Sequence, residues 1–184
     1  ITLVDDRVDF AAIVESGAPL ITPQYTFFNY PVEWWQDRLG QPVYLRAAGP
    51  VLVEIATEPV MAEAPIDDDA PGGVLPVEAA VRCTADGFEL WLTWQALERP
   101  AEDYSVFVHA LDADGQLMAT GDQFAPVYGW RPLTTWLPGE QVADVYPVRV
   151  EGAVEAVRYG LYHTLPDGSF ENVQEHEIPV NCDG

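Results

Sequence analysis

The sequence predicts a mainly β protein, an antiparallel immunoglobulin-like β-sandwich preceded by a small α/β segment, and three observations support this. From residue 77 onward, runs of β-favouring residues follow one another with turn signals between them. Asp-Gly pairs at Asp86, Asp114 and Asp167 separate such runs, and Asp-Gly readily adopts the positive backbone angles of tight hairpins. No segment with helical spacing interrupts this part of the chain.

The predicted sandwich, residues 77–184, contains seven strands joined by short connections. Seven short strands with regular turn signals are typical of a two-layer antiparallel sandwich. We expect the strands over residues 77–84, 88–95, 104–111, 116–120, 141–150, 157–164 and 169–180.

Residues 1–57 mix helix and strand signals and form the predicted α/β segment. Apolar spacing predicts a helix over 6–15 and a second over 31–39, which ends at Gly40, a natural C-terminal cap. The segment resembles the tail of a larger sheet and is too small for a core of its own. Short strands are expected over 19–22, 42–46 and 51–55.

Residues 58–76 predict a linker between the two parts, because Pro, Gly and Asp dominate this stretch and disfavour regular structure. Three adjacent aspartates, Asp67 to Asp69, could bind a cation. A solvated run of charge is the better explanation, and we favour it.

The charge balance is strongly acidic and excludes several classes of partner. Thirty acidic residues face eight basic ones, and the net charge is −22. Such a charge repels phosphate backbones and anionic lipid head groups, so we expect no nucleic-acid partner and no direct binding to an anionic membrane surface.

Apolar runs in this sequence are short and are broken by Asp, Glu or Pro, so none predicts a membrane span. The opening residues, Ile1 to Asp6, lack the pattern of a signal peptide, so we expect none within this sequence. We therefore expect that whatever exports or anchors the protein lies outside these residues.

The two cysteines, Cys83 and Cys182, are too far apart in sequence for a zinc or redox motif. In an exported protein they would join an early strand to the last one, whereas in a reducing compartment they would be buried thiols. We favour the disulfide.

An aromatic cluster between two predicted strands is the candidate ligand-binding site. Flat rings beside hydrogen-bonding and charged groups suit sugars, which stack on rings and bond through hydroxyls. A structural interpretation is also open, in which the rings cap the sandwich and Arg131 pairs with a carboxylate such as Asp122, and we favour it. The candidate residues are Asp122, Tyr128, Trp130, Arg131 and Trp136.

Catalytic and metal motifs are weak in this sequence. None of the three serines lies in a nucleophile-elbow pattern, and His109 and His163 lie inside predicted strands, where a structural role is usual. Glu175 and Glu177 would share a strand face that His176 leaves, which weakens a shared metal site. Asp112 to Gly115 suits a hairpin better than a calcium loop. We expect no catalytic activity from this chain alone, no metal and no cofactor.

Part of the sequence resembles a known architecture, and the resemblance is strongest over residues 103–146. Its most specific parts are DYSVFVHALD over 103–112, Asp114-Gly115, Asp122 and residues 126–129, 132–136, 138–140 and 144–146. Residues 40–45, 49–53 and 92–96 extend the resemblance. Together these stretches are similar to the C-terminal β-sandwich of large bacterial membrane proteins of the glycosyltransferase C type, in the protein mannosyltransferase and aminoarabinose transferase group.

The resemblance implies an extracytoplasmic location and an architecture, but it transfers no active site. The acidic catalytic loop of those transferases lies between membrane spans, and nothing here matches it. We therefore expect a non-catalytic accessory domain, anchored through parent sequence, that stabilises the parent or helps to present a sugar acceptor. Its partners would be the transmembrane portion of the parent and a glycan. The alternative is a free-standing secreted or surface protein that binds carbohydrate or assembles with partners.

Overall fold

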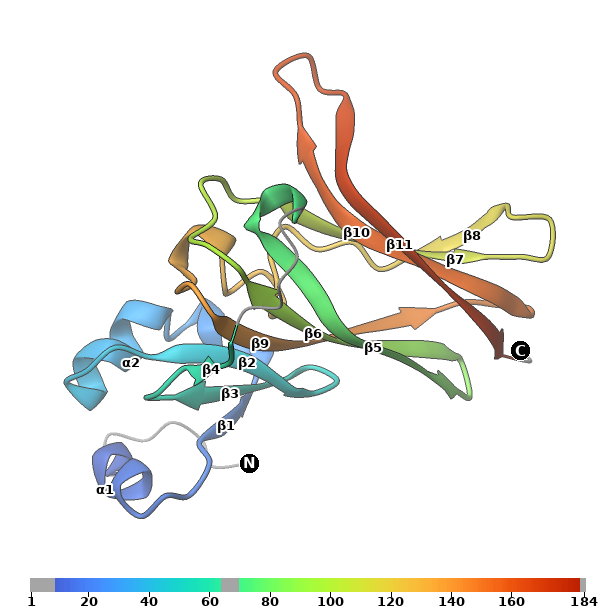
Figure 1. Cartoon of the computed structure of the whole chain (residues 1–184). Coiled ribbons are helices and arrows are strands. Elements are labelled where there is room, and N and C mark those ends of the chain that lie inside the picture. Colours follow the sequence, from blue (N-terminus) through green and yellow to red (C-terminus); the bar gives the residue numbers. More distant parts are fainter. Residues whose placement is uncertain (1–8, 64–69, 183–184) are drawn as a thin grey trace.

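A computed structural model describes residues 9–63 and 70–182, and it confirms the mainly β sandwich (Figure 1). Two four-stranded antiparallel sheets form the sandwich, with strand orders β11-β10-β7-β8 and β4-β9-β6-β5. Their strands are β4 (Val60–Met61), β5 (Val74–Thr84), β6 (Gly87–Ala96), β7 (Ser105–Leu111), β8 (Leu117–Thr120), β9 (Glu140–Arg149), β10 (Val154–Thr164) and β11 (Phe170–Cys182).

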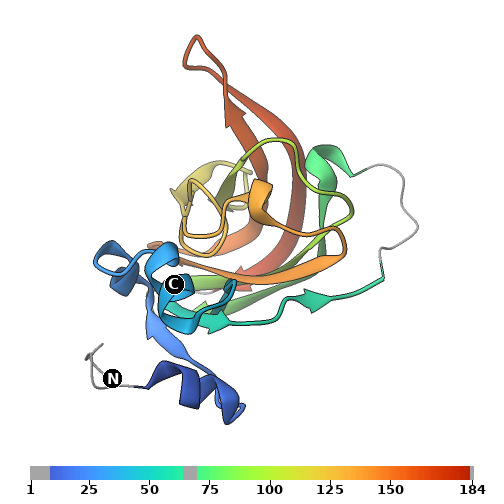
Figure 2. The ribbon, with the colours of Figure 1, turned by 90° about the vertical axis from the view of Figure 1, so that its left-hand side faces the viewer.

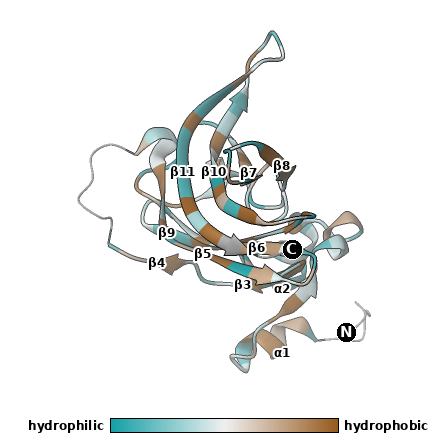
Figure 3. Cartoon of the chain, turned by 90° about the vertical axis from the view of Figure 1, so that its right-hand side faces the viewer, coloured by the Kyte–Doolittle hydropathy of each residue, from teal (hydrophilic) through white to brown (hydrophobic). Residues whose placement is uncertain are grey.

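The seven predicted sandwich strands are all present, and the Asp-Gly pairs at 86, 114 and 167 lie in hairpin turns as expected. Gly115 and Gly168 have φ of 74° and 85°, the left-handed region that glycine enters without steric cost. Side chains alternate between faces along these strands, and Figure 3 shows hydrophobic and hydrophilic stretches alternating along β11.

The first part of the chain forms a small antiparallel sheet with two helices. The sheet has the order β1-β3-β2, and it lies beside the sandwich next to β9 (Figure 2). The second helix ends at Gly40 in the left-handed conformation, as predicted. The elements are α1 (Phe10–Glu15), β1 (Ile21–Pro23), the 3-10 helix η1 (Gln24–Phe28), α2 (Val32–Leu39), β2 (Tyr44–Gly49) and β3 (Leu52–Ala56).

The predicted linker is more structured than its composition indicates. Strand β4 pairs with β9, and the 3-10 helix η2 (Pro71–Gly73) leads directly into β5, which begins at Val74. Asp67 to Asp69 lie outside the described residues.

One hydrophobic core runs through both parts of the molecule. Trp94 and Tyr146 fill the space between the two sandwich sheets, and Phe27 and Trp35 fill the space beneath the small sheet, all with at most 1% of their surface exposed. These side chains belong to one continuous cluster. The small sheet is therefore packed onto the sandwich as part of the same body.

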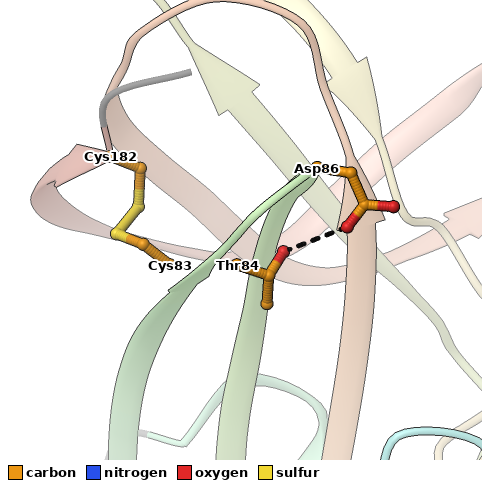
Figure 4. Close-up of a disulfide and its surroundings, with 4 residues drawn as sticks. All are labelled: Cys83, Thr84, Asp86 and Cys182. Atoms are coloured by element: carbon orange, nitrogen blue, oxygen red, sulfur yellow. Dashed lines mark hydrogen bonds between the residues drawn. A yellow bond between two sulfur atoms is a disulfide. The ribbon is translucent and has the colours of Figure 1, made fainter.

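Cys83 and Cys182 form a disulfide that joins strand β5 to strand β11 (Figure 4). These two strands are the edges of different sheets, so the bond closes one side of the sandwich.

Candidate functional site

The connection from β8 to β9, residues 121–139 (the junction loop), carries the predicted ligand residues and contacts the small sheet. Tyr128 makes the central contact, because its hydroxyl donates to the Gly49 carbonyl oxygen at 2.7 Å and accepts from the Val51 amide at 2.9 Å. Burial raises the pKa of Tyr128 well above that of an exposed tyrosine. The hydroxyl therefore remains a donor and fixes the junction loop to the turn between β2 and β3.

Two strained valines lie on either side of this contact. Val51 and Val127 both have φ of 55°, a conformation that is rare for a β-branched residue. The Val51 amide donates to Tyr128, and the Val127 amide donates to Asp144 at 3.0 Å. Hydrogen bonds thus hold both strained residues, which indicates a rigid junction.

Trp130 packs against the 3-10 helix of the small sheet rather than facing solvent alone. Its ring centroid lies 5.6 Å from that of Phe27 and 5.1 Å from that of Phe28, and its indole nitrogen lies 3.4 Å from the side-chain oxygen of Gln24. Trp136 is fully buried and donates to the Arg131 carbonyl oxygen. The two tryptophans therefore hold the junction loop in place, Trp130 by packing on η1 and Trp136 by a hydrogen bond within the loop.

Arg131 pairs with Glu140, and the suggested pairing with Asp122 is wrong. The Nη2 atom of Arg131 lies 2.7 Å and 3.0 Å from the two carboxylate oxygens of Glu140, and both side chains are buried. The guanidinium also lies over the ring of Tyr44, 5.4 Å from its centroid. A cleft of about 490 Å³ adjoins this pair, between the start of α2, strand β2 and residues 129–137.

The structure therefore brings together four of the five predicted residues, but as a structural joint. Trp136 is fully buried, and the guanidinium of Arg131 is bonded to Glu140 although Arg131 also lines the cleft. Asp122 lies apart from the others: its Oδ1 atom accepts from the Val108 amide at 3.1 Å and lies 3.6 Å from Nε2 of His109.

Asp122 instead borders a pocket of about 120 Å³ on the outer face of the sheet that contains β7 and β10 (the sheet-face pocket). A Cβ atom at Gly160 would come within 2.0 Å of the Gln174 carbonyl oxygen on β11 and within 2.9 Å of the Phe107 ring. The absence of a side chain at Gly160 therefore makes room for the pocket floor. The lining residues are Phe107, His109, Asp122, Tyr162, Phe170 and Asn172.

An apolar surface covers the β1–η1 side of the small sheet (the apolar patch). Pro23 pairs with Leu52 in the β1–β3 ladder, and the Gln24 amide donates to the Val51 carbonyl oxygen, which brings these segments together. Phe28 is the most prominent member, with 73% of its surface exposed. The patch consists of Ile21, Tyr25, Phe28, Val51 and Leu52.

The remaining histidines have structural partners. His163 lies 3.1 Å from a carboxylate oxygen of Glu171, and His176 stacks on Tyr159, where burial lowers its pKa. Glu175 and Glu177 share the opposite face of β11 from His176, as predicted, and both lie near Arg158. Within residues 9–63 and 70–182, no group of three potential metal ligands occurs, and no helix is long and apolar enough to cross a membrane.

Strand β9 buries a carboxylate that has no basic partner among the described residues. Asp144 lies inside the sandwich and accepts hydrogen bonds from the Tyr146 hydroxyl and from two backbone amides. Burial is the largest influence and raises the pKa of Asp144 to about 7. Its contact with the Val127 amide links the sandwich core to the junction loop.

Comparison of the chain with protein-family models, with curated proteins and with solved structures finds no match. The class of protein that the fold defines is therefore a β-sandwich with an attached small sheet, and any finer assignment depends on the surfaces described above.

Proposed function

We propose that this chain is a non-catalytic accessory domain on the extracytoplasmic side of a larger membrane protein that resembles the glycosyltransferases of C type. The observation that carries the proposal is the apolar patch. Phe28 and Tyr25 expose 73% and 56% of their surfaces beside three further apolar side chains. Clustered apolar exposure of this kind commonly marks an interaction site.

The proposed occupant of the patch is the transmembrane portion of the parent protein. The net charge of −22 makes an anionic lipid surface an unfavourable alternative. Arg46 and Glu54, on the same sheet, pair with each other at 2.7 Å and so add no net charge to this side. A largely neutral apolar surface on an acidic protein suits a protein partner.

The junction loop supports the proposal mechanically. It fastens the small sheet to the sandwich through Tyr128 and Trp130, and the Arg131–Glu140 pair holds the loop to β9. Docking through the apolar patch would therefore hold the whole sandwich in a fixed orientation to the parent.

The disulfide supports the proposed location. Disulfides persist in oxidising compartments, such as the periplasm or the cell surface, and are rare in the cytosol. The bond between Cys83 and Cys182 therefore favours an extracytoplasmic domain.

The second candidate function is a free-standing secreted or surface protein that binds carbohydrate. The sheet-face pocket favours it, because aromatic rings and hydrogen-bonding groups meet there. The two candidates differ in the size and location of the native polypeptide.

An antibody to this domain, used to blot fractionated source cells, separates the two. The proposal predicts a band far larger than 20.3 kDa in the membrane fraction. A soluble or released band near the mass of the domain itself would contradict it and favour the free-standing protein.

A further inference from the structure

We infer that the sheet-face pocket is a binding site for one ring of an uncharged sugar. The pocket lies on the outer face of the sheet β11-β10-β7-β8, away from both the apolar patch and the junction cleft. The sheet-face pocket lies on the sandwich, whereas the apolar patch lies on the small sheet. The inference therefore does not rest on the docking proposal.

Aromatic rings form the floor and one wall of the pocket. Phe107 is buried, and its ring centroid lies 6.4 Å from that of Tyr162; Tyr162 in turn meets Phe170 edge-to-face at 5.4 Å. Phe170 exposes 68% of its surface. These rings offer an apolar surface to the C–H face of a pyranose.

A further ring stands at the β8 side of the same face. Val106 forms a bridge with Gln123, and alternation along an extended chain then places Asp122 and Phe124 on the outer face. Phe124 has 90% of its surface exposed. Phe124 therefore lies on the same outer face as the pocket, two residues after Asp122, and offers an exposed ring to a longer oligosaccharide.

Polar groups around the rings match the needs of hydroxyls. Asp122 uses Oδ1 to accept from Val108, and Asn172 uses its amide nitrogen to donate to Glu175. Among the described residues, the Oδ2 atom of Asp122 and the side-chain oxygen of Asn172 accept no hydrogen bond. His109 adds an imidazole whose partner, Asp122, lies 3.6 Å away. Hydroxyls both donate and accept, so they can satisfy all three groups.

The charge around the pocket selects an uncharged sugar. Arg158 is shared by Glu175 and Glu177 at 3.5 Å and 3.0 Å, which leaves this part of the sheet with excess negative charge. A phosphorylated or acidic sugar would be repelled. A methylated ammonium ion would suit the rings and Asp122 but could not hydrogen-bond to the side-chain oxygen of Asn172 or to His109.

The junction cleft is a weaker candidate for the same ligand, although Trp130 and Arg131 line it. The Nη2 atom of Arg131 is bonded to Glu140, whereas its Nε atom is buried without a hydrogen-bond partner among the described residues. Trp130 already packs on Phe28. Apart from that Nε atom, Trp130 and Arg131 are therefore already engaged in the joint.

Titration of the ¹⁵N-labelled chain with methyl glycosides of glucose, mannose, galactose and N-acetylglucosamine tests the inference by NMR. At least one sugar should shift the Asn172 side-chain amide signals, with a dissociation constant on the order of 1 mM for a single ring. Phe170→Ala and the isosteric Asp122→Asn should each weaken binding about tenfold. Leu117→Ala, an exposed apolar change on the same sheet outside the pocket, should leave it unchanged.

Three results would overturn the inference. In the first, no sugar shifts the Asn172 side-chain amide signals, although the natural chain and the Asp122→Asn variant are both folded. In the second, a sugar shifts the Trp130 indole and not Asn172, which places the site in the cleft. In the third, choline chloride shifts the pocket signals and the sugars do not, which makes the pocket a cation site. None of these results bears on the apparent mass in cells, so the docking proposal stands or falls separately.

Discussion

Strand β9 buries two carboxylates in different ways. Glu140 is compensated by the guanidinium of Arg131 and also accepts from the Leu137 amide at 2.9 Å. Asp144 has only hydrogen bonds, from Tyr146 and from the backbone. Burial of Glu140 depends on the opposite charge of Arg131, whereas burial of Asp144 depends on protonation of its carboxylate. The two residues should therefore respond differently to substitution and to pH.

Asp144 should make the protein less stable as the pH rises from about 4 to about 7. Its pKa is raised from 3.8 to about 7, so in this window the folded state holds a proton that the unfolded state releases. The stability that the bound proton contributes is fully present below the unfolded-state pKa of 3.8. It is lost as the pH passes the folded-state pKa of about 7. The difference corresponds to at most about 4 kcal/mol. Urea unfolding between pH 4.5 and 8 measures it.

Asp144→Asn removes this titration and provides the control. The variant should lose stability less steeply across the same pH range than the natural chain does. Equal pH dependence in both proteins would show that Asp144 is ionised in the folded state or exposed to water.

Glu140→Gln should destabilise the chain by about 3 kcal/mol, because it leaves the Arg131 charge buried without compensation. Replacing both partners, as in Arg131→Met with Glu140→Gln, should cost less than the sum of the two single changes. Denaturant unfolding of the three variants measures the coupling. Additive effects would contradict a tightly coupled pair.

At the scale of elements, the disulfide and the hairpins define the sandwich. Cys83 and Cys182 are 99 residues apart, so their bond removes much of the conformational freedom of the unfolded chain. Substituting both by serine should therefore reduce the free energy of unfolding by about 4 kcal/mol. Thermal unfolding with and without a reducing agent checks this, because the serine variant should no longer respond to the reductant. Equal melting temperatures for the natural chain and the variant would contradict it.

The sequence was sufficient for elements defined by local chemistry. Asp-Gly pairs and Gly40 determine their own turns and cap, so the hairpins and the end of α2 could be predicted. Strand β4 could not, because two residues carry no periodicity and are extended only through pairing with β9. The start of β5 at Val74 could not be predicted either, because Pro76 within the strand indicates a loop.

The site could be predicted only in part. The clustering of Tyr128 and Trp130 is local, but Glu140 and Phe28 became their neighbours only through folding. The sheet-face pocket was missed because it combines residues from β7, β10 and β11 with Asp122. One sequence signal could have indicated it: aromatic residues at Phe107 and Tyr162 occupy positions whose strand alternation faces outward.

At the scale of the whole molecule, the proposed functions divide between two faces. The apolar patch on the small sheet would dock against the parent, while the sheet-face pocket on the sandwich remains open to a glycan. The common core and the junction loop fix the relation between them. An accessory domain built in this way would hold a sugar at a defined distance from the membrane.

Hydroxyl-radical footprinting of native membranes, compared with the isolated chain, tests the docking role most directly. Tyr25 and Phe28 are exposed in the isolated chain and should be oxidised readily. In membranes they should be protected several-fold, whereas Leu117, which is as exposed as Tyr25 at 56%, should be oxidised to the same extent in both samples. Unchanged oxidation of Tyr25 and Phe28 in the membrane sample would contradict the assignment of this chain as a docked accessory domain.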